Sequence, residues 1–445
     1  MFFKKDSNTN SNQDTESVSP KAQTDSLCII GQGINEQDST LLKNALKKSS
    51  VTILDSEKVT QTTALEIECF LSLFQEPTSL IPVATHLNAA RESKKNGLPV
   101  LIIAITPEQL LSLGEFLSKT ASENTLSGLR LVIGSTINEI SENLAGKETP
   151  ILEPTVIRMP IAPEVENSPQ TMFYAISPEL RNVVSVITAC AENNIDRLYL
   201  LGAPGSGKTS LAYYYWLARK RGRFVIVNLS AESTDDKASM KSLLCGHVAG
   251  SIAGSGAREG ALSFAQDGVC FLDESHGVTG SVMQVLMEAL DSGQFMPFGA
   301  TQKRLLQCGV VFASNRSWEK LRAMIHLDEH ARLGATIIEI PDLRYRLEDL
   351  IAVTSAALYK FSKRCSNWQA PKGLSKEAWD LVAHCKWRGN TRTLFRVMES
   401  ACVDFAMAKK EHTVISQHSL THGISLWEPE EHDSHSVYAS YGGAR

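Results

Sequence analysis

The segment from residue 198 to residue 216 limits the fold of this chain more than any other. It begins with the apolar run Leu198–Leu201, passes through the turn Gly-Ala-Pro-Gly-Ser-Gly, and enters a predicted helix at about Lys208. The turn and the helix start fit the pattern G-x-x-x-x-G-K-[ST], with Lys208 and Thr209 in the last two places. In such a turn, backbone N–H groups converge on phosphate oxygens, and the helix N-terminus adds a partial positive charge. The sequence therefore predicts a nucleotide site between a buried strand and a helix.

The residues expected to bind the nucleotide are those of the turn and the first turn of the helix. They are Gly202, Ala203, Pro204, Gly205, Ser206, Gly207, Lys208, Thr209 and Ser210. We expect Lys208 to reach the β- and γ-phosphates and Thr209 to ligate Mg²⁺. ATP and Mg²⁺ are therefore the predicted cofactors.

Two later apolar runs end in polar side chains that suit the chemistry of a nucleotide site. Residues 268–272 are followed by Asp273 and Glu274, and residues 309–314 are followed by Asn315. In a parallel α/β sheet, the carboxyl ends of the strands form the edge at which ligands bind. We expect Asp273 to hold Mg²⁺ through water, Glu274 to polarise the attacking water, and Asn315 to order that water. The alternative for each is a surface or turn residue at the end of a strand.

Composition bounds the class of protein. A chain of 445 residues has room for two to four domains, and its net charge of −5 gives no general attraction to nucleic acid or anionic membranes. No apolar run approaches the ~18 residues of a membrane span, and no signal-peptide pattern opens the chain. The nine cysteines include no Cys-x-x-Cys pair, which favours reduced core thiols over zinc ligands. We expect a cytoplasmic protein without membrane contact.

The residues before the nucleotide loop are expected to form a separate domain. Residues 1–25 are polar and predict a disordered tail, and the proline-rich residues 151–172 predict a linker. Between them, residues 26–150 alternate apolar runs with helical stretches, which predicts a small parallel α/β domain that is flavodoxin-like or a degenerate receiver. The expected strands lie at 27–30, 51–54, 99–105 and 129–133.

Several motifs follow one another in an order that is typical of one family. They are the phosphate loop, Asn228, Gly246-His247, Ala257–Leu262, Val269–Glu274, Ala313–Arg316, Arg332-Leu333, Pro341–Arg344 and Trp387–Arg392. Together they resemble the AAA+ domain of bacterial enhancer-binding proteins, the ATPases that activate sigma-54 RNA polymerase. The resemblance covers about residues 173–425 and implies an AAA+ nucleotide-binding α/β domain at 173–345 and a helical lid at 346–425. A flexible tail is expected at 426–445.

The resemblance implies a role for four further polar residues. Asn228 resembles the residue that restrains the catalytic glutamate, and Asn315 resembles sensor 1. Arg392 resembles the sensor 2 arginine, which touches phosphate within the same subunit. Arg332 resembles an arginine finger that acts on the nucleotide of the neighbouring subunit. Because such a site is complete only between subunits, the resemblance implies a homo-oligomer, most simply a hexameric ring.

The chain also departs from the family pattern. Where the family's polymerase-contacting loop reads Gly-Ala-Phe-Thr-Gly-Ala, residues 250–255 read Gly-Ser-Ile-Ala-Gly-Ser. His326 stands at the place of a second family arginine. The twenty residues 426–445 are too few for a DNA-binding helical domain, so we expect no autonomous DNA-binding domain.

Three hypotheses follow. The first is a ring-forming AAA+ ATPase that hydrolyses Mg-ATP and remodels a macromolecular partner through the loop at 246–260. The second is a sigma-54-dependent transcription regulator without its own DNA-binding domain, for which RNA polymerase with sigma-54 is the partner. The third is an ATP-gated scaffold with little hydrolysis, which only the substitution at His326 favours.

Overall fold

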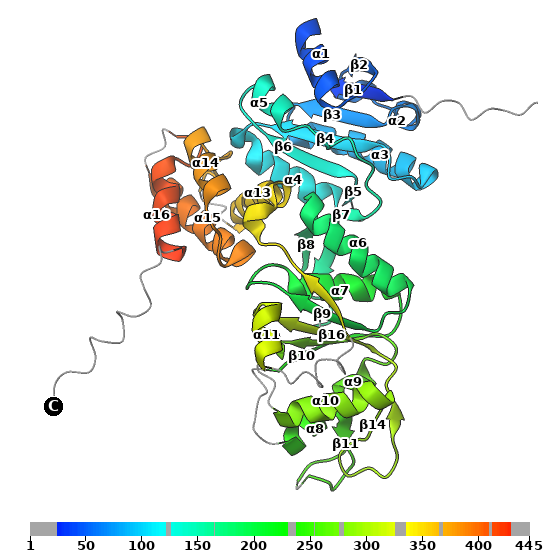
Figure 1. The fold of residues 1–445 in the computed structure, drawn as a ribbon. Coiled ribbons are helices and arrows are strands. Elements are labelled where there is room, and N and C mark those ends of the chain that lie inside the picture. The colour runs from blue at the N-terminus through cyan, green and yellow to red at the C-terminus, as the bar shows by residue number, and fades with distance from the viewer. Residues whose placement is uncertain are drawn as a thin grey trace, which may run out of the picture.

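Three regions follow one another along the chain, and the last of them returns to the first. The computed structural model describes residues 25–121, 126–163, 165–229, 237–252, 254–275, 280–324, 335–364, 368–408 and 412–428. Figure 1 shows an N-terminal α/β region, a central α/β region and a C-terminal helical region that lies beside the N-terminal one. Most of the two expected tails falls outside the described residues. Within those residues, no helix has the length and apolar character needed to cross a membrane.

The N-terminal region is built on five parallel strands in the order β2-β1-β3-β4-β6. The strands are β1 (Ser26–Ile30), β2 (Ser50–Leu54), β3 (Cys69–Leu73), β4 (Val100–Ile105) and β6 (Leu129–Ile133), and the helices are α1 (Glu36–Ala45), α2 (Gln61–Glu66), α3 (Ile81–Lys94), α4 (Leu110–Thr120) and α5 (Ile137–Glu142). In chain order this is 2-1-3-4-5, the flavodoxin-like doubly wound order. The predicted α/β class is therefore confirmed.

The central strand β3 was not among the predicted strands. Its sequence is Cys-Phe-Leu-Ser-Leu, and Ser72 interrupts the apolar run although its side chain is fully buried. A strand buried on both faces reads as a continuous apolar run, and one polar residue in five weakens that pattern.

The segment 151–172, expected to be a linker, contains regular structure. Strands β5 (Leu126–Ser127), β7 (Pro154–Pro160) and β8 (Gln170–Tyr174) form a three-stranded antiparallel sheet between the two α/β regions. Pro154 and Pro160 stand at the two ends of β7, where a missing N–H disrupts few ladder bonds. The prolines therefore mark the limits of a strand here.

The central region carries a second parallel sheet, in the order β10-β13-β16-β9-β17. Its strands are β9 (Arg197–Leu201), β10 (Phe224–Asn228), β13 (Val269–Asp273), β16 (Gly309–Ser314) and β17 (Thr336–Glu339), and its helices are α6 (Pro178–Glu192), α7 (Lys208–Arg219), α8 (Lys237–Cys245), α9 (Ala261–Phe264), α10 (Gly280–Ser292) and α11 (Trp318–Met324). Two short hairpins, β11 (Gly246–His247) with β12 (Arg258–Glu259) and β14 (Gln294–Phe295) with β15 (Arg304–Leu305), lie at the end of this region farthest from the N-terminal sheet in Figure 1.

The C-terminal helices form a lid that shares its core with the N-terminal region. They are α13 (Leu347–Arg364), α14 (Lys376–His384), α15 (Asn390–Met407) and α16 (Gln417–Trp427). One apolar cluster runs from the N-terminal sheet through α4 and α13 to the fully buried Trp387. The lid is therefore packed against the N-terminal sheet and not only against the central region.

Candidate functional site

The glycine-rich loop connects β9 to α7 and has no room for side chains at two of its glycines. Gly205 and Gly207 have φ angles of +72° and +110°, a backbone region that favours glycine. A Cβ at Gly205 would lie 2.4 Å from the carbonyl oxygen of Gly389 in the lid. A Cβ at Gly207 would lie 2.8 Å from the ring of Phe173 on β8. The loop is therefore enclosed by the lid on one side and by the three-stranded sheet on the other.

Lys208 opens α7 and points back over the loop. Its Nζ donates hydrogen bonds to the carbonyl oxygens of Gly202 and Ala203, at 2.7 and 3.2 Å. Burial lowers the pKa of Lys208, while the charges of Asp273 and Glu274 act in the opposite direction. The guanidinium of Arg392 also lowers this pKa, so charged groups from the sheet and the lid lie within electrostatic reach of Lys208.

The predicted strand-end residues meet at one edge of the sheet. Asn228 at the end of β10 is paired in register with Asp273 at the end of β13. The next strand, β16, ends beside the loop, since the N–H of Gly202 donates to the carbonyl of Ser314 at 3.2 Å. Asn315 follows directly and is exposed, as is Asn228. The polar residues that end β10, β13 and β16 thus lie at the same edge of the sheet as the phosphate loop that follows β9.

Glu274 stands in an unusual backbone conformation at this edge. Its φ angle is +55°, and its N–H donates to Oδ1 of Asp273 at 2.9 Å. Non-glycine residues rarely adopt a positive φ, and such strain clusters at functional sites. Asp273 and Glu274 are both half-buried, so both residues remain partly accessible.

The loop fits a phosphate group. Ser206 is almost fully buried, and its Oγ has no hydrogen-bond partner among the described residues. The N-terminus of the twelve-residue helix α7 begins at the next residue but one, so it provides N–H donors and a positive dipole end. Thr209 and Ser210, in the first turn of that helix, are half-buried. An anion with several oxygen acceptors would satisfy these donors.

The lid is fastened to the loop by two residues that the sequence argument did not single out. Asn390 donates from Nδ2 to the carbonyl of Pro204 at 3.2 Å, and Thr391 donates from Oγ1 to the carbonyl of Gly205 at 2.8 Å. Both lie in the Gly-Asn-Thr-Arg segment that was considered only for its arginine. Arg392, the next residue, is exposed.

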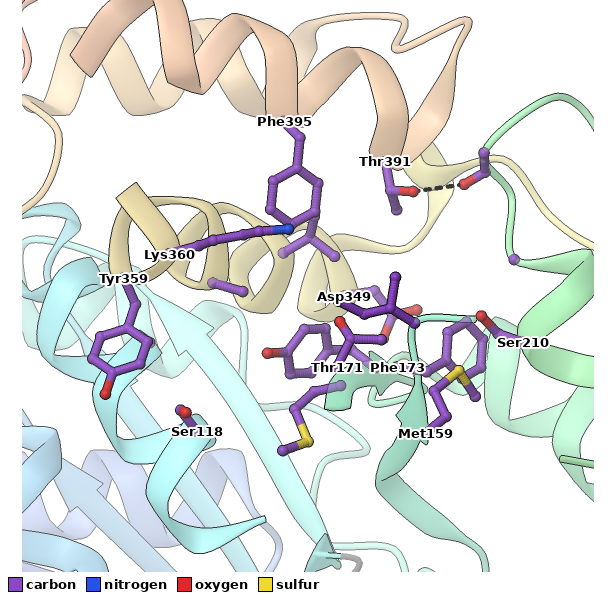
Figure 2. A pocket seen from close by; sticks show the side chains of 18 of the residues that line it. Ser118, Met159, Thr171, Phe173, Ser210, Asp349, Tyr359, Lys360, Thr391 and Phe395 are labelled. Atoms are coloured by element: carbon purple, nitrogen blue, oxygen red, sulfur yellow. Dashed lines mark hydrogen bonds between the residues drawn. The ribbon is translucent and has the colours of Figure 1, made fainter. Parts of the chain in front are cut away.

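A cavity of about 520 Å³ extends from the loop between the lid, β8 and the N-terminal helix α4 (Figure 2). Ser210 and Phe173 lie at the loop end, and Ser118 of α4 and Tyr359 of α13 lie at the opposite end. This volume is within the range of small-molecule sites. Phe173 and Ser118 could not be assigned to it from the sequence, since no motif surrounds them.

Two sequence predictions concern residues that lie wholly or partly outside the described ranges. Arg332 and His326 lie outside the described residues. The loop at 246–260 is described except for residue 253, and it is held at its base by the β11–β12 hairpin. His247 donates from Nε2 to the carbonyl of Gly256 at 2.8 Å, and its Nδ1 is hydrogen-bonded to Ser242 Oγ at 2.7 Å.

A phosphate loop at the start of α7, two acids at the end of β13 in the same sheet, and a helical lid over the loop define a P-loop nucleotide-binding domain of the AAA+ type. Residues 173–338 match the family described as the sigma-54 interaction domain. The resemblance drawn from the sequence motifs is therefore confirmed for this part of the chain.

Known proteins are similar to about half of the chain or to more of it. The Nif-specific regulatory protein of Herbaspirillum seropedicae is 31% identical over 229 residues, which cover 50% of this chain and 41% of that protein. The transcriptional regulatory protein ZraR of Escherichia coli K12 is 29% identical over 230 residues, or 51% of each chain. The chain spans about half the length of the curated relatives it matches. The solved structure of NtrX from Brucella abortus in complex with ADP aligns with 93% of this chain and 88% of its own, with a TM-score of 0.49 and 13% identity.

Proposed function

We propose that this chain is a Mg²⁺-dependent ATPase that works as a ring and uses ATP turnover to remodel a macromolecular partner. The observation that carries the proposal is the convergence of Lys208, Asp273 and Glu274 beside a glycine loop that the lid closes. A site that only binds nucleotide does not need Glu274 in addition to Asp273 at the end of the strand. The paired acids are what hydrolysis requires.

Each residue has a role that follows from its chemistry. Lys208 exchanges its bonds to Gly202 and Ala203 for phosphate oxygens when nucleotide enters. Thr209, directly, and Asp273, through water, would hold Mg²⁺, which would supply charge neutralisation at the phosphates. Glu274 accepts a proton from the attacking water.

Further proposed roles come from the resemblance. Asn315 orders the attacking water, and Asn228, beside Asp273 in the sheet, restrains Glu274 before nucleotide is sensed. Arg392 contacts phosphate within the subunit, and Arg332 contacts it from the neighbouring subunit. A planar arginine cation stabilises charge spread over the transferred phosphoryl group, and an arginine finger contributes about 10³-fold or more in rate. The trans role requires the ring, for which we propose six subunits.

The favoured partner is RNA polymerase carrying sigma-54. The matching family is described by that interaction, and the named relatives are regulatory proteins. The loop at 246–260 is the proposed contact, although residues 250–255 differ from the family's polymerase-contacting sequence. Gly250 and Gly254 have positive φ angles with open space around them, so this loop can change its path at little steric cost.

A Glu274→Gln variant tests both the reaction and the partner. We expect it to bind ATP as tightly as the wild type while its hydrolysis falls at least about 100-fold. The trapped protein is then used to capture partners from its native cytosol, with Lys208→Ala as the control that cannot bind nucleotide. Recovery of polymerase with sigma-54 only from the Glu274→Gln protein supports transcription regulation. Recovery of another complex identifies a different remodelling task. If the wild type and Glu274→Gln hydrolyse ATP at the same low rate, the protein is instead an ATP-gated scaffold.

A further inference from the structure

Glu348, in the first turn of α13, is a buried carboxylate held by the N-terminal region. Arg130 of β6 donates to it from Nε, at 3.2 and 3.0 Å to the two oxygens, and from Nη2 at 2.7 Å. Lys147 donates at 2.7 Å, and the backbone N–H of Leu131 at 3.0 Å. Burial alone would raise the pKa of Glu348, but the bonds from Arg130 and Lys147 lower it below its usual value. The carboxylate is therefore charged and fully satisfied by groups more than 200 residues away in the sequence.

The next residue, Asp349, is attached to the central region instead. Its Oδ1 accepts hydrogen bonds from the N–H groups of Ile176 and Ser177, at 2.7 and 3.0 Å. Its own N–H donates to Ser177 Oγ at 3.0 Å. Ser177 caps the start of α6, so Asp349 ties α13 to the domain that carries the phosphate loop. Two adjacent carboxylates thus attach one helix to two different parts of the molecule.

The N-terminal region also contacts the lid through backbone groups. A Cβ at Gly114 of α4 would lie 2.2 Å from the carbonyl oxygen of Ser355, so α4 and α13 cross at close range. The N–H of Leu111 donates to the carbonyl of Lys372 at 2.9 Å, and the N–H of Leu374 donates to the carbonyl of Pro107 at 3.0 Å. Contacts of this kind do not survive a relative shift of the two regions. The N-terminal region therefore sets the position of α13.

The position of α13 in turn sets the position of the lid over the loop. The turn that precedes α13 is bonded to the lid, because the N–H of Leu343 donates to Oδ1 of Asn390 at 2.6 Å. The same Asn390 donates to the carbonyl of Pro204 in the phosphate loop. Arg392 follows two residues later and acts electrostatically on Lys208. A continuous series of contacts therefore leads from the N-terminal sheet to the nucleotide site.

We propose that Arg130 and Lys147 are positioning residues for nucleotide binding, which act through Glu348 to hold α13 and Arg392 over the phosphate loop. A shift of the N-terminal region relative to α13 then changes ATP affinity and turnover in the same subunit. This inference rests on the proposed ATPase function and adds the route by which the N-terminal domain regulates it.

The test is a double-mutant cycle in the full-length protein. Arg130→Met, Glu348→Gln and the combined variant are compared with the wild type for the Kd of an ATP analogue and for kcat and KM of hydrolysis. We expect each single variant to change Kd by about fivefold or more, and the double variant to be no worse than the worse single one. Lys376→Met is the matched control. Lys376 makes an exposed 2.6 Å ion pair with Glu139 across the same interface, and exposed pairs contribute little.

The outcomes separate the inference from the proposed function. If the variants are less stable to urea but, where folded, bind and hydrolyse ATP as the wild type does, Glu348 is structural and the inference is overturned. An effect of Lys376→Met as large as that of Glu348→Gln overturns it too. If Glu348→Gln does not fold, Lys147→Gln gives the same comparison, because it leaves the paired bonds from Arg130 in place. If the wild type itself shows no more ATP binding than Lys208→Ala, the proposed function fails and the positioning role with it.

Discussion

Asp349→Asn should change the free energy of unfolding by an amount that depends on pH. Burial raises the pKa of Asp349 from its ordinary value of 3.8 to about 7, and the nearby Arg346 offsets only part of this effect. Between these two values the unfolded chain releases the proton while the folded protein retains it, so stability falls as the pH rises. Asparagine carries no charge and keeps the oxygen that accepts from Ile176 and Ser177. The variant should equal the wild type near pH 4 and be more stable above pH 7.

The magnitude follows from the size of the pKa change. About three units separate the two values, and each unit corresponds to about 1.4 kcal/mol. Asp349 is 1% exposed, so solvent screening does not reduce this figure. The advantage of the variant above pH 7 therefore has an upper limit of about 4 kcal/mol.

Glu348→Gln should show the opposite trend one residue away. The pKa of Glu348 is lowered in the folded protein, so its contribution to stability is fully present above the ordinary pKa of 4.5 and is lost as the pH falls through the folded value. Removing its charge leaves the buried Arg130 without its partner, which typically costs about 3–5 kcal/mol at neutral pH. This loss should shrink as the pH falls below 4.5.

The assay is urea unfolding of the wild type and both variants from pH 3 to pH 8, followed by tryptophan fluorescence. Trp379 and Trp387 are buried in the lid and report on the region around α13. The quantity compared is the difference in unfolding free energy between each variant and the wild type at the same pH, in which the other titrating groups cancel. A difference for Asp349→Asn that is constant across this range, or that has the same sign of slope as Glu348→Gln, would refute the reasoning.

Three further predictions concern the loop and the lid. Gly205→Ala should weaken nucleotide binding and lower the melting temperature, because the positive φ alone costs about 1–2 kcal/mol and the new Cβ collides with Gly389. Calorimetry measures the affinity for an ATP analogue and the melting temperature, and an unchanged affinity would contradict the prediction. Gly114→Ala should destabilise the protein by about 1–3 kcal/mol, since the methyl group forces α4 away from Ser355; an unchanged urea midpoint would show that the crossing is looser than described. Lys208→Met should abolish nucleotide binding without loss of stability, since within the described residues the hydrogen bonds of the lysine amine go to loop carbonyls. Retained binding in equilibrium dialysis would contradict its role.

The phosphate loop and the strand-end residues were predictable because their signals are local. In both cases the functional residues directly follow the apolar run that predicts the strand: the glycine loop at 202–209 follows one run, and the two acids follow the run at 268–272. Parallel pairing then brings these ends together, as the register between Asn228 and Asp273 shows. The roles of the individual site residues stay predictions until they are tested by substitution.

The contacts between regions were not predictable, because nothing local in the sequence encodes them. Arg130 and Glu348 are 218 residues apart, and each alone resembles an ordinary charged residue. The sequence predicts a linker in place of strands β7 and β8, because a high proline content is typical of linkers, whereas Pro154 and Pro160 stand at the ends of a strand. The structural role of a buried charge or of a proline at a strand end depends on partners that are distant in the sequence.

The shared helix α13 limits how this protein can be recombined. Its apolar face completes a core with the N-terminal sheet, while its first turn is bonded to the nucleotide-binding domain. A chimera that joins residues 173–428 to an unrelated N-terminal domain would expose that face to water and leave Glu348 without its cations. Exchange of the N-terminal region thus demands simultaneous changes on α13, so the two halves are expected to be inherited together.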